Sequence, residues 1–443
     1  MEPRRTIVAG AQALLLAACS TGSDSSDASP WGKSLELGDG SVMASPSRSG
    51  EIAIAGTISG PGQVSDRSVD FGMDQASFFT SFDRQGDVRW LVRGSNLDRT
   101  AVKGFAADAT GGLVAVGWFI ETVDFGRGEV TAIGVDTFVD RLDSSGNVVW
   151  VRHFSADDGG PAGAGNSNPA AVVVGADGSV VFAGNFTGTI GFGGRALDAA
   201  QQGAYVTKLD REGRHVWSRS LGAAPTYVER LAIDSEGDLI LTGARMASSP
   251  DDPTSNPDEP EDGARFVMKL GSDGSDRWET RLGASLLPDL DAMTVDASGG
   301  VIIAGQSQSD VELGGLHLDA RPGAVTPFAA QLSSKGEALW IRELDISGFG
   351  RPLGAAVDSS GRAYVAGFEV VGAGSSVGFL YRLGEQGKIA QRWDFGDGEA
   401  VVSDVQPLGS DLLLTGSFAG RIDIGGTNLS AGEDGLFLAR FRP

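Results

Sequence analysis

Side chains that commonly carry out catalysis are scarce in this chain. Its 443 residues include one Cys and three His, and the imidazoles of His153, His215 and His317 fall in widely separated segments with no shared spacing. A nucleophile and its base must approach to about 2.6–3.2 Å, and these positions predict no such contact. No Ser lies in a Gly-x-Ser-x-Gly turn between a strand and a helix. The sequence therefore assigns no catalytic residue.

Carboxylates are abundant, but no recognised metal or cofactor motif contains them. Lys and Arg number 35 and Asp and Glu 58, which gives a net charge of −23. The acidic turn at residues 234–238 lacks the Asp-x-Asp-x-Asp-Gly pattern and the following Glu of a calcium loop. The Gly-rich residues 159–165 lack the Lys-Ser/Thr of a phosphate loop. We predict no metal, no cofactor and no nucleic-acid partner, since phosphate binding needs clustered Lys and Arg. A catalytic carboxylate pair is left open.

The single Cys follows a segment typical of export signals. Arg4 and Arg5 precede residues 6–16, which are uncharged, mostly apolar and too short to span a bilayer. This segment ends in LAAC, residues 16–19, which resembles the lipobox of bacterial lipoproteins. The resemblance implies a signal peptide over residues 1–18 and lipidation of Cys19. It also implies a lipidated flexible tether over residues 19–30.

The alternative is an ordinary signal peptide with a chance Cys. The paired Arg fit either the general secretory or the twin-arginine route. Ser20 after the Cys favours the outer membrane over the inner one. We therefore expect a lipid-anchored protein of the bacterial cell envelope, held at the outer membrane and facing either the periplasm or the surface.

The rest of the chain is an internal repeat of seven copies. Each copy has a turn glycine, an apolar run and a second glycine six residues on: Gly50/Gly56, Gly111/Gly117, Gly178/Gly184, Gly237/Gly243, Gly299/Gly305 and Gly361/Gly367, with Ser410/Gly416 as the seventh. Seven of the eight Trp recur with nearly the same period: Trp31, Trp90, Trp150, Trp217, Trp278, Trp340 and Trp393. Asp-x-x-Gly between apolar runs is typical of a hairpin turn. We expect about four short strands in each copy, with the Trp as structural residues.

Four-stranded units repeated around a ring form a β-propeller. We therefore predict an all-β fold over residues 31–443, a seven-bladed β-propeller of four-stranded antiparallel blades. The last copy ends after its third strand, whereas the Trp strand at residues 31–35 has no third strand before it. We expect these two segments to pair, residues 31–35 beside residues 436–441, because an unpaired sheet edge would otherwise remain.

The repeats resemble those of the seven-bladed (SBBP-type) propeller family of bacterial lipoproteins and surface proteins. Matching segments include residues 123–126 (VDFG), 136–142 (DTFVDRL), 146–150 and 358–367. A weaker resemblance is to pyrroloquinoline-quinone-type propellers, whose Asp-x-x-Gly-x-x-x-Trp motif fits residues 83–90, 143–150 and 210–217. In that family the Trp packs between blades, so the resemblance implies no cofactor. Both resemblances imply the fold and are almost silent on activity.

Two irregular acidic segments supply the candidate partner-binding residues. Residues 248–263 and 155–169 contain Asp251, Asp252, Asp258, Glu259, Glu261, Asp262, Asp157 and Asp158. We interpret them either as solvated insertions or as contacts for a basic partner or a weak cation. In an antiparallel blade the second-to-third and fourth-to-first loops share one face of the ring, and both segments belong to it. Because loops on a rigid scaffold often carry binding residues, we expect binding on that face.

The predicted function is that of a monomeric, non-catalytic binding or scaffolding module with a protein or glycan partner and a membrane anchor. Two alternatives stay open. One is an envelope enzyme, a hydrolase or lyase with carboxylates at the propeller channel, which a buried carboxylate pair of raised pKa would favour. The other is a scaffold for outer-membrane assembly. A channel lined by apolar, Ala- and Gly-rich first strands would favour binding.

Overall fold

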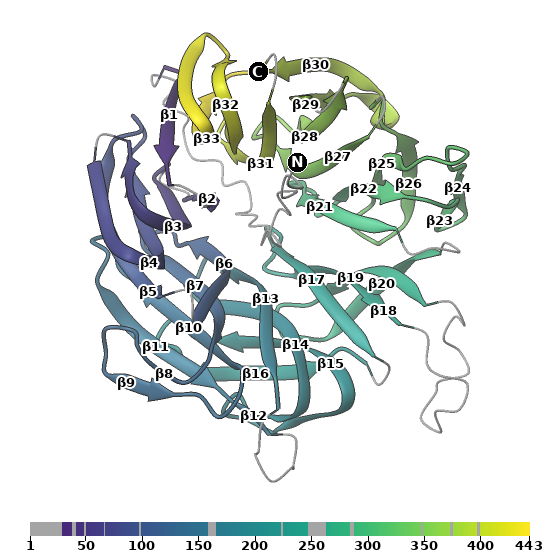
Figure 1. The fold of residues 1–443 in the computed structure, drawn as a ribbon. Helices are drawn as coiled ribbons and strands as arrows, with labels where there is room; N and C mark the ends of the chain where they lie inside the picture. The colour runs from purple at the N-terminus through teal and green to yellow at the C-terminus, as the bar shows by residue number, and fades with distance from the viewer. Residues whose placement is uncertain are drawn as a thin grey trace.

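The chain folds into a ring of antiparallel sheets (Figure 1). The computed structural model describes residues 29–37, 41–47, 50–65, 67–96, 99–157, 165–222, 225–246, 263–283, 288–346, 349–372, 375–396 and 399–443. These residues are mostly strand, with a single 3-10 turn at Glu385–Gly387. No helix in these ranges is long and apolar enough to cross a bilayer.

Five blades are sheets of their own, and in each the four strands follow one another in chain order. Blades two and three consist of β6 (Thr100–Ala107), β7 (Leu113–Phe119), β10 (Asp136–Leu142) and β11 (Val148–Phe154), then β13 (Ser167–Val174), β14 (Val180–Ile190), β15 (Leu197–Leu209) and β16 (His215–Ser220). Blade four consists of β17 (Thr226–Ile233), β18 (Leu239–Arg245), β19 (Ala264–Leu270) and β20 (Asp276–Gly283). Blades five and six consist of β21 (Asp289–Val295), β22 (Val301–Ser307), β25 (Thr326–Leu332) and β26 (Ala338–Glu343), then β27 (Gly350–Val357), β28 (Ala363–Val371), β29 (Ser375–Leu383) and β30 (Ile389–Phe395).

The first and last blades join into one eight-stranded sheet. Its strands are β31 (Ala400–Leu408), β32 (Asp411–Ile424), β33 (Thr427–Phe441) and β1 (Trp31–Glu36) of blade seven, and β2 (Ser41–Pro46), β3 (Ile52–Val64), β4 (Arg67–Phe82) and β5 (Val88–Asn96) of blade one. β1 pairs with β33, with Trp31 opposite Arg440 and Leu35 opposite Leu436. Figure 1 shows β1 and β33 side by side there. The predicted closure of the last blade is thus confirmed.

The propeller therefore does not have one separate sheet for each blade, because blades one and seven share a sheet. β3 and β4 extend beyond the length of the repeat, and the far end of β3 pairs with β1 at Leu35–Val64 and Glu36–Gln63. The seven first strands nevertheless contact one another in a closed circle, β2, β6, β13, β17, β21, β27, β31 and back to β2. The all-β propeller of four-stranded blades is confirmed.

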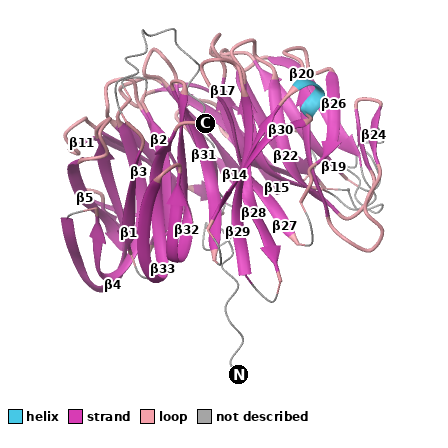
Figure 2. Cartoon of the chain, turned by 90° about the horizontal axis from the view of Figure 1, so that it is seen from above, coloured by secondary structure: helices cyan, strands magenta, loops and turns pink. Residues whose placement is uncertain are grey.

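Short additional strands lie in the connections between blades and strands. They are β8 (Thr122–Asp124) with β9 (Glu129–Thr131), β12 (Ala156–Asp157) beside the end of β14, and β23 (Val311–Leu313) with β24 (Leu316–Leu318) beside β20. In Figure 2 the blade strands run through the thickness of the ring, and turns and loops lie at its two faces. We call the face with the second-to-third and fourth-to-first loops the loop face, and the opposite one the turn face.

The repeated Trp side chains pack across blade boundaries. Trp150 on β11 donates from Nε1 to the carbonyl oxygen of Arg211 in blade three at 3.0 Å. A Cβ on Gly213 of the same turn would lie 3.0 Å from that indole, and one on Gly86 of blade one would lie 2.7 Å from the ring of Trp31. Both glycines also have positive φ, 75° and 83°. These turns therefore need glycine for conformation and for the close approach of the indole.

Candidate functional site

The first strands of the blades line the centre of the ring, and six of the seven contain a β-bulge. The register shifts lie at equivalent places, so that one residue of each strand is extra: Lys103, Ala170, Glu229, Asp291, Leu353 and Ser403. A bulge bends the strand and re-aims side chains, and such features are frequent beside binding and active sites. Charged residues occupy this position in blades two, four and five, and in blades six and seven Arg351 and Asp404 lie within two residues of it.

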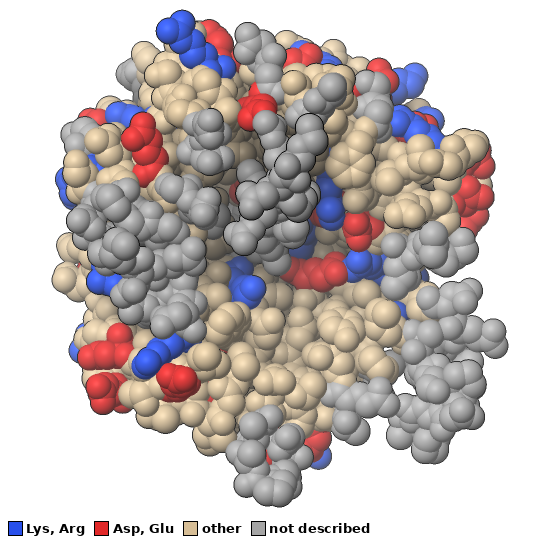
Figure 3. Space-filling view, in the orientation of Figure 1, with Lys and Arg blue, Asp and Glu red and all other residues tan. Residues whose placement is uncertain are grey.

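The charged residues of blades four to seven form what we call the channel cluster, built from four first strands. Its members are Glu229 and Arg230 on β17, Asp289 and Asp291 on β21, Arg351 on β27 and Asp404 on β31. Figure 3 shows basic and acidic side chains gathered beside the centre of the ring, over β17, β21 and β27. The first strands begin at the loop face, so Asp289 and Arg351, at the starts of their strands, lie nearest its mouth.

Arg351 holds the outer part of the channel cluster together. Its Nε and Nη2 donate to the two carboxylate oxygens of Asp291 at 2.8 and 2.6 Å. Nη2 also lies 3.3 Å from Oδ2 of Asp289. The hydrogen bonds to Asp291 raise the pKa of Arg351, whereas burial raises the pKa of Asp291 in spite of this guanidinium. A planar, two-pronged contact of this kind fixes orientation as well as charge.

The inner part of the cluster is almost closed to solvent. Arg230 and Asp404 are each 8% exposed. Arg230 donates from Nε to the carbonyl oxygen of Leu290 at 3.2 Å, and burial lowers its pKa while Asp291, Glu229 and Asp404 oppose that effect. Burial raises the pKa of Asp404 to about 6, opposed by the amide of Gln406, which donates at 2.9 Å. Two carboxylates with raised pKa values thus flank one buried guanidinium.

The channel cluster is suited to recognition by charge and has few free groups for chemistry. Asp291 is occupied by a bidentate guanidinium, and Asp404 accepts hydrogen bonds from Gln406 and from the amide of Val405. Arg265 on β19 extends the network outward, because it pairs with Glu229 and donates to the carbonyl oxygen of Pro288 at 2.7 Å. The channel is therefore lined by charged as well as apolar side chains, and a purely apolar lining was the arrangement that would have favoured binding.

Exposed large apolar side chains concentrate on the loop face. Five of the eight in the described ranges lie there: Ile133, Tyr227, Met246, Phe349 and Val371, which are 38–61% exposed. The other three, Val149, Val216 and Leu339, each precede the Trp of an outer strand and lie at the rim. Protein interfaces are enriched in Tyr, Phe and Met over the remaining surface. The loop face thus combines apolar side chains with the mouth of the channel cluster.

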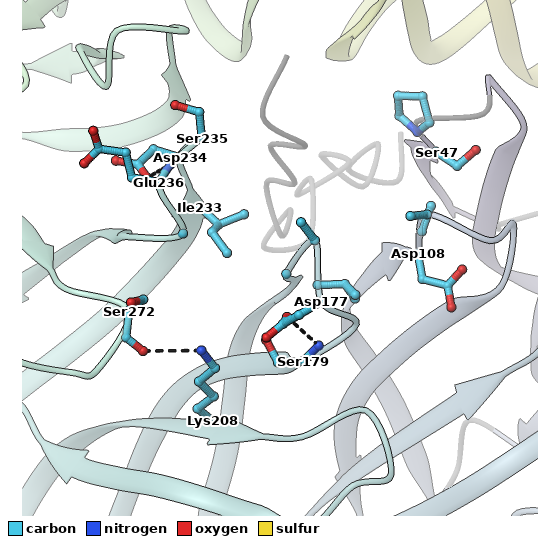
Figure 4. A pocket seen from close by; sticks show the side chains of 17 residues that line it. Ser47, Asp108, Asp177, Ser179, Lys208, Ile233, Asp234, Ser235, Glu236 and Ser272 are labelled. Atoms are coloured by element: carbon cyan, nitrogen blue, oxygen red, sulfur yellow. Dashed lines mark hydrogen bonds between the residues drawn. The ribbon is translucent and has the colours of Figure 1, made fainter. Parts of the chain in front are cut away.

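A cavity of about 290 Å³ opens on the turn face, where blades one to four meet (Figure 4). Three of its carboxylates belong to hairpin turns: Asp108 and Asp234 open Asp-x-x-Gly turns, and Asp177 lies in the turn at residues 175–178. Asp108 accepts from the Thr110 hydroxyl at 2.7 Å and from Arg141 at 2.7 Å, and Asp177 accepts from the amide and hydroxyl of Ser179 at 2.9 and 2.6 Å. Burial raises the pKa of Asp108, but the hydrogen bonds outweigh it and the net pKa is lowered.

The third turn carboxylate and the lysine of this cavity are also engaged. Asp234 pairs with Lys269 at 2.7 Å, and the Nζ of Lys208 donates to the carbonyl oxygen of Ser272 at 3.3 Å. These charged groups therefore stabilise turns and blade contacts, and we assign no chemistry to this cavity.

Most residues singled out from the sequence as partner contacts lie outside the described residues. These are Asp158, Asp251, Asp252, Asp258, Glu259, Glu261 and Asp262, and Cys19 of the lipobox lies outside them as well. Asp157 is described: it is exposed, lies on β12 and pairs with Thr189 of β14. Sequence reasoning missed the channel cluster. Its only signal was charge next to the apolar first strands, as in VERLAI at residues 228–233.

The three His lie in outer elements and in different blades. His153 is on β11, where its ring centroid lies 6.2 Å from that of Phe119, and His215 on β16 contacts the hydroxyl of Ser218 at 3.2 Å. His317 is on the exposed β24. No imidazole in the described ranges contributes to the channel cluster.

Comparisons with known proteins identify no family. No family model matches the chain, and no curated protein matches it. Solved structures that it resembles include the Neurospora crassa Pan2 WD40 domain (TM-score 0.46, 9% identity, 92% of this chain and 88% of that chain). Others are virginiamycin B lyase from Staphylococcus aureus (0.42, 10%, 93% and 100%) and XC5397, a gluconolactonase from Xanthomonas campestris (0.36, 16%, 82% and 89%). Likenesses this weak carry no argument about function.

Proposed function

We propose that this chain is a lipid-anchored propeller of the bacterial cell envelope, of the SBBP type, that acts as a non-catalytic binding module. Its partner is a protein that docks on the loop face over blades four to six. The lipobox at Cys19 and the export signal before it support the location. The loop face supports the activity.

One observation carries the proposal: the grouping of exposed apolar side chains around a charged channel mouth. Tyr227 and Met246 belong to blade four, Phe349 and Val371 to blade six, and the Asp289–Arg351 pair opens between them on blades five and six. Apolar anchors beside charged groups give a protein partner both buried area and orientation. Among the described residues, the rim of the ring exposes only single large apolar residues at repeat positions.

The experiment is site-specific photo-crosslinking of the full chain in intact cells. A photoreactive phenylalanine analogue replaces Phe349, which is 55% exposed, and in the control it replaces Leu339, which is 52% exposed but lies on an outer strand. We expect a discrete adduct from position 349 alone, reduced at least severalfold by Met246→Asp or Val371→Asp. No adduct at 349, or the same adducts at both positions, would overturn the proposal.

A second candidate, an envelope hydrolase or lyase, is favoured by the pair of buried carboxylates with raised pKa in the channel. Asp404, with a pKa of about 6, could hold a proton near neutral pH, as a general acid does. Both carboxylates, however, already accept hydrogen bonds from Arg351 or Gln406. We therefore retain binding as the conclusion.

A further inference from the structure

A second cavity lies between blades one and two, away from the channel cluster. Its volume is about 170 Å³. Phe79 of β4, Val92 of β5 and Phe138 of β10 line it, and Phe125, which follows β8, covers it. The rings of Phe125 and Phe138 lie 4.7 Å apart. Apolar and aromatic side chains from two blades thus line the cavity, together with the buried hydroxyl residues Ser77 and Thr100.

One carboxylate lies among these apolar side chains. Asp140 of β10 lines the cavity and is only 6% exposed. Its Oδ1 is buried, and no group in the described residues donates a hydrogen bond to it. A buried acceptor without a partner costs stability, so such an atom needs an explanation. Burial raises the pKa of Asp140 to about 7, in spite of the opposing charge of Arg127.

The repeat shows that the fold does not need an acid at this position. In all seven blades the third strand pairs one residue directly with the repeated Trp, and the residue before it is Asp140 in blade two. The equivalent residues are Thr80, Thr207, Met268, Ala330, Phe379 and Ala439. Six blades pack with a neutral side chain there. The carboxylate of Asp140 is therefore a feature of one blade and not of the architecture.

The charged groups near the cavity do not neutralise Asp140 by contact. Arg127 donates from Nη2 to the carbonyl oxygen of Val149 at 3.0 Å and also bonds the carbonyl oxygen of Val148. Asp124 accepts from the amide of Gly126 at 2.7 Å at the exposed mouth, where the exposed Arg93 also lies. Exposed residues at the mouth and buried ones below give a small ligand a route to Asp140.

We propose that this cavity binds a small organic amine, with its apolar body against the phenylalanine rings and its ammonium group donating to the carboxylate of Asp140. An ionised carboxylate only accepts hydrogen bonds, so the ligand must supply the donor. A cationic donor gives the stronger, charge-assisted bond, and aromatic faces attract cations. The same cavity disfavours carboxylates and phosphates. This site is independent of the loop face and of the proposed partner.

The test is titration of the full chain with benzylamine, with benzyl alcohol as the uncharged probe of the same shape, followed by NMR or calorimetry. We expect benzylamine to bind about tenfold or more tightly than benzyl alcohol. Binding of benzylamine should strengthen as pH rises through about 7, where Asp140 ionises. Asp124 and Arg93 are the other charged residues that line the cavity.

The decisive variant is Asp140→Thr, which installs the residue that blades one and three already carry there. It should lower benzylamine affinity about tenfold or more and abolish the pH dependence, whereas the exposed Asp157→Ala should change neither. Asp140→Asn serves as a second, isosteric variant with the same expected loss. No benzylamine binding to the unmodified chain would mean that the cavity holds water only. That result, equal affinity for both probes, or equal affinity of the Asp140 variants would overturn the proposal.

Discussion

At the residue scale, the buried carboxylates are of two kinds: those that stabilise the propeller and those that reduce its stability. Asp108 and Asp411 are buried carboxylates whose hydrogen bonds and guanidinium partners leave their pKa values lowered in spite of burial. Asp140 and Asp404 are buried carboxylates whose pKa values are raised to about 7 and about 6. Residues of the second kind reduce stability at neutral pH and so are better explained by function.

We predict that Asp140→Thr stabilises the protein at neutral pH. The folded state binds the Asp140 proton more tightly than the unfolded chain does, since the pKa rises from 3.8 to about 7. The stability that this proton gives is therefore present below about pH 4 and lost as pH rises through about 7. The variant should be more stable by on the order of 4 kcal/mol at pH 8 and nearly equal to the original chain at pH 4.

Urea unfolding at the two pH values measures this difference. Asp157→Ala is the control, because Asp157 is exposed and its loss should leave the profile unchanged. Equal stability of the Asp140→Thr protein and the original chain at pH 8 would show that Asp140 is not desolvated in solution.

At the element scale, the sequence predicted the features that follow from local turn chemistry and from the number of repeated Trp strands. Asp-x-x-Gly turns and repeated Trp located the strands, and the spare Trp strand located the closure of the ring. The union of blades one and seven was not predicted, because it depends on the unusual length of β3 and β4. The channel cluster was not predicted either. Its residues come from four strands, and the bulge residues of those strands, Glu229, Asp291, Leu353 and Ser403, share no residue type.

The strand that closes the ring gives the prediction at this scale. Removing residues 1–36 deletes β1, which pairs with β33 along five residues and buries Leu35 completely. It also removes the Trp31 indole, whose Nε1 donates to the carbonyl oxygen of Arg84 at 3.0 Å. Burial of two such side chains contributes roughly 3–5 kcal/mol. We expect a lower melting temperature and aggregation through the exposed edge of β33.

The matched control is a chain that begins at residue 29, just before β1, and should behave as one that begins at residue 20. Calorimetry and light scattering compare the three chains. A chain without β1 that melts at the same temperature and stays monodisperse would contradict the closing role of this strand.

At the scale of the whole molecule, charge and surface determine how the propeller relates to a membrane. Its net charge of −23 repels anionic lipid headgroups, and the described residues contain no helix that could span a bilayer. The apolar side chains of the loop face are separate residues on different blades, which do not form an inserted element. The attachment that we propose is through acyl chains at Cys19. Lipid attachment there would leave the whole ring free to present its loop face to a partner.

We therefore predict that Cys19→Ser releases the protein from membranes without changing its fold. Each buried CH₂ of an acyl chain contributes about 0.8 kcal/mol, and stable anchoring takes at least two chains, so loss of the thiol removes nearly all of the membrane affinity. The measurement is fractionation of cells that express either form, combined with incorporation of radiolabelled fatty acid. Phe349→Asp on the loop face is the control and should remain in the membrane fraction. If the Cys19→Ser protein stays with the membranes, or if the unmodified chain takes up no label, the propeller is held by contacts of its own surface, and the loop face becomes the first place to look for them.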